Sequence, residues 1–179
     1  MEIPLLFLPL LAAIISGFFG KQIGDRNSEI ITSLFVSISA ILSFILFYKV
    51  IINGYESNII IATWINSGTL NINWSIKIDA LSSVMLVVVT LISALVHIYS
   101  IGYMSHDPHK QRFMAYLSLF TFAMLTLVTS DNFLQLFFGW EGVGLCSYFL
   151  IGFWFKKDSA NAAAIKAFLV NRVGDFGFA

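Results

Sequence analysis

The sequence is poor in charge and in cysteine. Only 11% of its 179 residues are Asp, Glu, Lys or Arg, compared with about 25% in a typical soluble domain. Ten acidic and ten basic residues give a formal net charge of zero, so no long-range attraction to nucleic acid is expected. Cys146 is the only cysteine, which excludes an intrachain disulfide and an all-cysteine metal site. We therefore expect neither a nucleic acid partner nor a metal on this chain.

The sequence features of redox proteins are missing as well. The chain has no G-x-G-x-x-G turn, no cysteine cluster for an iron–sulfur centre and no paired histidines at haem-like positions. We therefore predict that this chain binds no cofactor. Any electron chemistry coupled to it must take place in another subunit.

What the sequence does contain is long apolar runs. Hydrophobic residues make up 58% of it, its mean hydropathy is +0.86, and a membrane-spanning helix needs about 20 mostly apolar residues. The first run lacks the basic leader of a signal peptide, so we interpret it as a retained helix. The sequence predicts an all-α polytopic membrane protein with about six transmembrane helices, at Ile3–Gly20, Ile30–Ile52, Ala80–Met104, Phe113–Ser130, Phe133–Phe155 and Ala160–Ala179.

One connection between these helices has a different pattern. Apolar and polar residues alternate strictly from Leu70 to Asp79, which is typical of a strand with one apolar face. With Ile59–Ile65 as its partner and residues 66–69 as the turn, we predict an extramembrane β-hairpin on the outer surface of the bundle. The chain then divides into two helices (1–52), the hairpin connection (53–79) and the remaining helices with the charged motifs (80–179).

Basic residues in the short loops indicate the orientation. Six of them fall in the connections at residues 21–29, 105–112 and 156–159. Loops rich in Lys and Arg stay on the cytoplasmic or matrix side. We therefore expect the N-terminus and the hairpin on the opposite side.

Glu141 is the residue that most needs an explanation. It lies about 12 Å into the fifth apolar run, since a helix rises 1.5 Å per residue, and a carboxylate at that depth costs roughly 3 kcal/mol or more. Gly139, Gly142 and Gly144 surround it, and such small residues permit close helix approach or leave room for water. Two interpretations remain open: a proton-handling group, or a neutral acid that hydrogen-bonds two helices together.

The last apolar run carries three further charged residues. Arg172 and Asp175 are three residues apart, so they share a helical face and can form an ion pair that tunes the field near Glu141. Lys166 is about half a turn out of phase with Asp175. It either joins a polar chain in the bundle interior or reaches the membrane surface. His97, in the third run, is either a satisfied hydrogen-bonding residue or a weaker candidate for proton relay.

At these residues the chain resembles a known family. The motifs are Gly139–Trp154, Ala163–Gly177, Ile78–Ser82 and His97–Met104. They are similar to the first part of an antiporter-like membrane subunit of respiratory complex I. That subunit is called subunit L in bacterial NADH-quinone oxidoreductase and subunit 5 in the mitochondrial enzyme.

The resemblance implies a function and a set of partners. It implies a proton-translocating subunit in the membrane arm, next to other membrane-arm subunits, in the bacterial inner membrane or alternatively the mitochondrial inner membrane. FMN, iron–sulfur clusters and quinone would belong to partner subunits. Glu141 would pair with a lysine on a seventh helix, while Lys166, Arg172 and Asp175 match charged family positions. Since family members have over a dozen helices, the chain corresponds to an N-terminal fragment of a larger antiporter-like bundle.

Two other functions compete with this interpretation. The large subunit of a multisubunit sodium/proton antiporter has a similar fold and a similar tryptophan–glutamate motif. A helix bundle with a purely structural or assembly role would need no proton transfer at Glu141.

Overall fold

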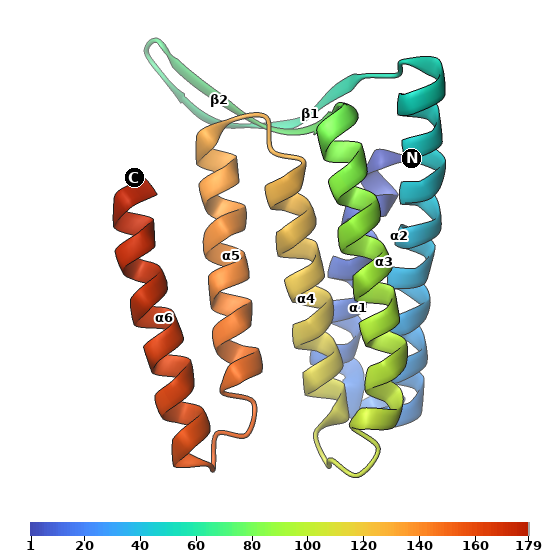
Figure 1. The fold of residues 1–179 in the computed structure, drawn as a ribbon, viewed down its shortest axis with the longest axis vertical. Coiled ribbons are helices and arrows are strands. Elements are labelled where there is room, and N and C mark those ends of the chain that lie inside the picture. Colours follow the sequence, from blue (N-terminus) through green and yellow to red (C-terminus); the bar gives the residue numbers. More distant parts are fainter. Residues whose placement is uncertain (179) are drawn as a thin grey trace.

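The computed structural model describes residues 1–178 and contains six helices and one β-hairpin (Figure 1). Ala179, the last residue of the sixth predicted run, lies outside the described residues. The elements in chain order are α1 (Glu2–Ile23), α2 (Asp25–Asn53), β1 (Ser57–Ser67), β2 (Leu70–Ile78), α3 (Ala80–Tyr103), α4 (Lys110–Val128), α5 (Phe133–Ile151) and α6 (Asp158–Phe178).

The first four helices form a bundle, and the last two extend it to one side. α1 packs against both α2 and α4, α3 packs against α2 and α4, α5 packs against α4, and α6 packs mainly against α5 (Figure 1). One apolar core joins the four bundle helices to β2 at one end of the molecule, and it consists of Leu5, Leu6, Leu46, Val50, Ile76, Ile78, Leu86 and Leu125. Burial of these side chains holds the hairpin base onto the bundle.

Five helices of the described chain, α1 to α5, are long and apolar enough to cross a membrane. The sixth predicted helix forms, as α6, but it does not reach the same apolar character. Its 21 residues include Asp158, Lys166, Arg172 and Asp175, and each charged residue opposes insertion into hydrocarbon. All six predicted helices therefore form, and five of them have the length and hydropathy of a membrane span, while α6 carries more charge.

The hairpin is confirmed, with a tighter turn than the sequence predicts and a first strand that is longer at both ends. β1 and β2 are antiparallel, and Ser67 pairs with Leu70, so the loop is Gly68-Thr69 rather than residues 66–69. Gly68 has a φ of +59°, a conformation that glycine adopts without steric cost. The apolar face of β2 is buried at Ile72, Ile76 and Ile78, as its alternation predicts.

The fifth helix ends four residues earlier than predicted, at Ile151 rather than Phe155. Phe153 turns back into the protein, where it is buried. Arg112 of α4 donates to the Phe153 carbonyl at 3.0 Å. This bond satisfies a backbone group that a continuing helix would have paired internally.

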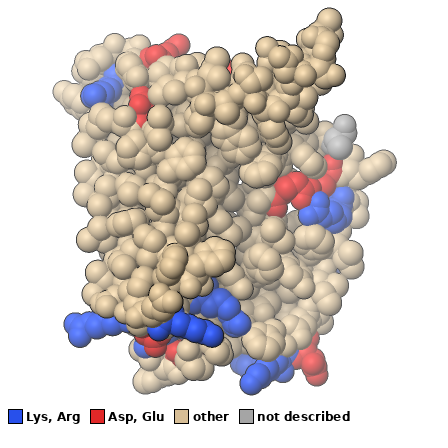
Figure 2. All heavy atoms as spheres, turned by 180° about the vertical axis from the view of Figure 1, so that it is seen from behind, with Lys and Arg blue, Asp and Glu red and all other residues tan. Residues whose placement is uncertain are grey.

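Charged atoms gather at the two ends of the molecule (Figure 2). The hairpin and the α4–α5 turn lie at one end, and the α1–α2, α3–α4 and α5–α6 connections lie at the other (Figure 1). The three loops that carry the six basic residues therefore share one side, which is the arrangement that the orientation prediction requires. One mixed acid–base group interrupts the apolar flank between the two ends (Figure 2).

Candidate functional site

The helix that carries Glu141 begins at a side-chain cap. Asn132 Oδ1 accepts from the backbone N–H of Gln135 at 2.8 Å, so Asn132 caps the start of α5. Within α5, Glu141 is the only charged residue, and its side chain is 23% exposed. Its depth along the helix is the predicted one, because α5 begins at Phe133.

Two glycines bring α5 against α4. A Cβ on Gly139 would lie 2.7 Å from the backbone N and Cα of Leu127, and one on Gly142 would lie 3.2 Å from the Ala123 Cβ. Both glycines therefore serve close helix packing, as small residues do in membranes. Gly144 lies toward α6 instead, where its Cβ position would be 4.0 Å from Asn171.

Glu141 belongs to a cluster of two acids and one base. Arg172 Nη1 donates to Glu141 Oε1, and the same nitrogen lies 3.3 Å from Asp175 Oδ2. The indole of Trp140 donates to the other oxygen of Asp175 at 2.8 Å. The guanidinium also lies over the Phe168 ring, 4.5 Å from its centroid. The Arg172–Asp175 pair is thus present, and Arg172 additionally bridges from α6 to α5.

A cavity of about 110 Å³ adjoins this cluster. Glu141, Arg172 and Asp175 line it, together with Ser147 and Asn171. A single water needs roughly 10–15 Å³ of such space and two to four polar partners. The cavity therefore has room and hydrogen-bonding groups for several waters beside the ionisable side chains.

Lys166 and His97 lie outside the cluster. Lys166 is exposed on α6 and does not line the cavity. Within the described residues it therefore does not join a polar chain in the bundle interior, which was one of its two predicted positions. His97 is fully buried between α3 and α4. Its Nδ1 lies 2.8 Å from the Ser93 carbonyl and its Nε2 lies 3.0 Å from the Ser118 hydroxyl, so both ring nitrogens have partners.

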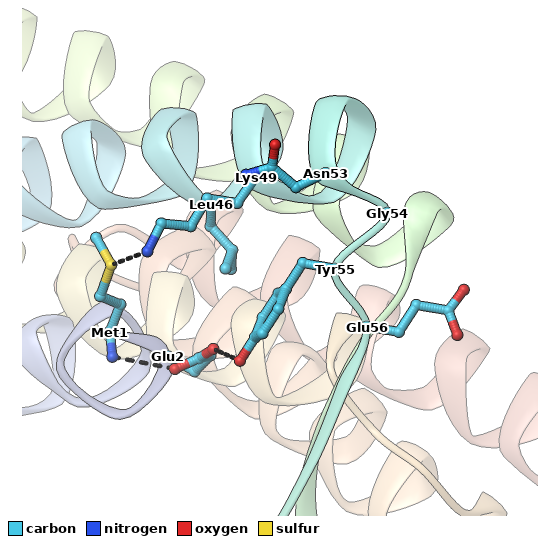
Figure 3. A pocket seen from close by; sticks show the side chains of 8 residues that line it. All are labelled: Met1, Glu2, Leu46, Lys49, Asn53, Gly54, Tyr55 and Glu56. Atoms are coloured by element: carbon cyan, nitrogen blue, oxygen red, sulfur yellow. Dashed lines mark hydrogen bonds and ion pairs between the residues drawn. The ribbon is translucent and has the colours of Figure 1, made fainter.

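A larger pocket of about 640 Å³ opens at the hairpin end, beside the start of α1 (Figure 3). The carboxylate of Glu2 accepts from the Tyr55 hydroxyl at 2.9 Å and from the terminal amine at 3.0 Å, and both bonds are drawn in Figure 3. These bonds of Glu2 tie α1 to the hairpin connection, and Glu56, the other acid of this pocket, is exposed, so the pocket is a less suitable functional site. Within residues 1–178, no group of three His, Cys, Asp or Glu side chains could hold a metal ion.

Sequence reasoning missed two partners in the cluster. The contact of Arg172 with Glu141 joins residues 31 positions apart, and no periodicity within one helix predicts it. Trp140 has an indole N–H that needs an acceptor when it lies among apolar groups. That requirement was the available signal for its bond to Asp175.

Two family models match the chain. One is described as NADH-ubiquinone oxidoreductase (complex I), chain 5 N-terminus, and it matches residues 64–114. The other is described as NADH:quinone oxidoreductase/Mrp antiporter, TM, and it matches residues 130–179. With its five candidate spans, the chain is therefore a multi-pass membrane protein of the antiporter-like class.

Curated relatives identify the family within that class. The chain is 58% identical over its whole length to NADH-ubiquinone oxidoreductase chain 5 of Arabidopsis thaliana, covering 27% of that protein. It is 53% identical over 99% of its length to NADH-quinone oxidoreductase subunit L of Rickettsia bellii, covering 28% of it. The chain belongs to this chain 5/subunit L family and spans about a quarter of the length of these relatives, at their N-terminal part.

A solved structure shares the fold. A chain of the membrane-bound sulfane sulfur reductase, an archaeal respiratory membrane complex, matches with a TM-score of 0.80 and 19% sequence identity. The match covers 98% of the present chain and 35% of that one. At this identity the match supports the arrangement of the helices alone.

Proposed function

We propose that this chain is the N-terminal part of a proton-translocating membrane-arm subunit of NADH-quinone oxidoreductase. The observation that supports the proposal most directly is the Glu141–Arg172–Asp175 cluster, which lies beside a polar cavity between α5 and α6. Intramembrane ionisable groups commonly mark ion and proton pathways. The similarity of the whole chain to subunits of this enzyme supports the same assignment.

The cluster holds one more acid than base. With both carboxyls ionised it carries one uncompensated negative charge, and uptake of a single proton makes it neutral. Arg172 stays protonated, so it can stabilise an anion but cannot pass on a proton. The Nη1 atom of Arg172 contacts both acids. When one of the two carboxyls is protonated, Arg172 therefore still pairs with the other, ionised carboxyl.

The proton therefore enters and leaves through the carboxyls and through water in the adjoining cavity. The family resemblance implies a lysine on a later helix as the exchanging base. Lys166 is exposed and separate from the cluster, so we propose that it interacts with another segment of the longer protein or with the membrane surface, rather than with Glu141.

We also propose that electron transfer takes place elsewhere in the enzyme. FMN, iron–sulfur clusters and quinone would be bound by partner subunits, and this chain would contact other membrane-arm subunits and the lipid bilayer. The membrane would be the bacterial inner membrane or the mitochondrial inner membrane, since the relatives come from bacteria and from eukaryotes.

The test is Glu141→Gln in the complete enzyme, with proton pumping and NADH–quinone electron transfer measured on the same vesicles. We expect proton pumping per NADH to fall, because the amide keeps the size of the side chain but cannot take up or release a proton. Glu56→Gln, at an exposed acid before the hairpin, is the matched control and should pump normally. Undiminished pumping in Glu141→Gln would reject the proposal and favour a structural role for this acid.

A sodium/proton antiporter is the second candidate. The family model that matches residues 130–179 covers both NADH:quinone oxidoreductase and Mrp antiporters, so this region alone does not separate them. Ion dependence does separate them. Proton movement that requires sodium and persists without NADH would support the antiporter.

A further inference from the structure

Gln135 is a polar residue that the proposed proton chemistry does not use, yet it is fully buried in the first turn of α5. Its side chain accepts from the backbone N–H of Ser75 at 3.0 Å and donates to the carbonyl of the same residue at 2.7 Å. One side-chain amide thus pairs with both backbone groups of a β2 residue, as a neighbouring strand would.

Further bonds tie the same segment to the hairpin. The backbone N–H of Lys77 donates to the Thr129 carbonyl at 2.9 Å. Asn132 donates from its side chain to the Asn73 carbonyl at 2.8 Å. Alternate residues of β2, at positions 73, 75 and 77, therefore bond to the end of α4 and the start of α5, and they fix the depth at which α5 begins.

The rest of α5 packs along one side against α4. Within the described chain only Gln135, Gly139 and Cys146 of this helix are buried. At 100° per residue they lie within about 40° of one another, so they form a single narrow seam. Glu141 is about 240° from Gln135 around the helix axis and contacts α6 through Arg172. A rotation of α5 about its seam would therefore move the Glu141 carboxylate relative to Arg172.

We propose that Gln135 is a positioning residue for Glu141. By locking the first turn of α5 onto β2, it sets the rotation and depth of the helix, and with them the contact between Glu141 and Arg172. The hairpin thus acts as a fixed reference for the proton-handling acid. This inference rests on the proposed function of Glu141.

The test uses Gln135→Leu and Gln135→Glu in the complete enzyme. The leucine variant removes both bonds to Ser75, whereas the isosteric glutamate variant keeps an acceptor for the Ser75 N–H. We expect Gln135→Leu to lower the proton-pumping rate about threefold or more, since a misplacement near 1 Å can cost up to 10²-fold. Gln135→Glu should lose less. Both variants should change the pH profile of pumping while the pH profile of electron transfer stays as in the parent enzyme.

A double-mutant cycle separates positioning from a general loss of stability. If Gln135 acts through the Glu141–Arg172 contact, then Gln135→Leu should reduce pumping much less in an Arg172→Lys background than in the parent enzyme. If the leucine variant does not assemble, the same cycle with Gln135→Glu decides. Full additivity, or an unchanged pH profile of pumping, would overturn the proposal.

Gln111→Leu is the matched control, because Gln111 is a glutamine of α4 that bonds to Asp25 at the opposite end of the bundle. It should leave the pH profile of pumping unchanged. The outcome for Glu141→Gln keeps the two proposals distinct. If that variant pumps normally, the proposed function fails. If Glu141→Gln does not pump, but the losses of pumping in Gln135→Leu and Arg172→Lys are additive, only the positioning role of Gln135 fails.

Discussion

Single residues decide how closely the membrane helices of this protein approach. At Gly139 the α4 backbone occupies the space where any side chain would begin, because a Cβ there would lie 2.7 Å from Leu127 N and Cα. Backbone atoms cannot rotate away as the end of a flexible side chain can. At Gly102 of α3, by contrast, no atom lies within 4 Å of the Cβ position. A methyl group therefore fits at Gly102 but not at Gly139.

We predict that Gly139→Ala destabilises the protein by about 1–3 kcal/mol, the usual cost of overpacking, by forcing α5 away from α4. Gly102→Ala should be neutral or slightly stabilising, because alanine favours helix by up to about 1 kcal/mol over glycine. Thermal unfolding of the purified variants in detergent micelles measures both effects. Equal unfolding midpoints for the two variants would contradict this account.

At the scale of helices and strands, the sequence predicts the elements that have strong local patterns. The sequence predicts the start of α3 at Ala80, the start of α5 at Phe133 and the apolar face of β2 from hydrophobic patterning alone, and the structure confirms all three. The bonds of Gln135 to Ser75 and of Arg172 to Glu141 could not be predicted in this way. Each joins residues of two different elements, 60 and 31 positions apart, and depends on how those elements pack.

The start of α3 provides a pH-dependent prediction. Asp79 and Ser82 form a capping box, in which the Ser82 backbone N–H donates to Asp79 Oδ1 at 2.8 Å. That bond holds the pKa of the Asp79 carboxyl below its ordinary value of 3.8. Since the folded-state pKa is the lower one, Asp79 contributes stability above the unfolded-state pKa, and this contribution is lost as the pH falls through the folded-state pKa.

We therefore expect Asp79→Ala to lower stability by about 1 kcal/mol at neutral pH. Acidification from pH 5 to below pH 3 should reduce the difference between parent and variant, because the protonated cap is a weaker acceptor. Thermal unfolding midpoints across this range provide the measurement. A difference that stays constant down to the lowest pH would exclude a role for the ionised carboxylate.

At the scale of the whole molecule, the positions of the basic loops and of the hairpin indicate the same orientation in the membrane. The loops with the six basic residues lie at one end, and the hairpin and the α4–α5 turn lie at the other (Figure 1). The polar cluster of α5 and α6 lies between the ends, on the flank (Figure 2). The protein thus separates a mostly apolar bundle, α1 to α4, from a flanking helix pair that carries the Glu141–Arg172–Asp175 cluster.

We predict that the hairpin lies on the side opposite the cytoplasm or matrix. Ser67→Cys, beside the hairpin turn, should react with a membrane-impermeant maleimide added from that opposite side. Ser105→Cys, in the α3–α4 loop, should react only after the membrane is opened. The unsubstituted protein is the control, because its single Cys146 is buried and should stay unlabelled. The reverse labelling pattern would invert the orientation.

The packing of α1 against α4 has a consequence for how the protein is made. α1 ends at Ile23 and α4 at Val128, so roughly one hundred further residues must leave the ribosome before α1 meets its second neighbour. At synthesis rates of about 5–20 residues per second, that delay is on the order of 5–20 s. During this interval the newly inserted α1–α2 pair must remain in the bilayer with one side unfilled, so a chaperone or insertase that shields α1 would act before α4 arrives.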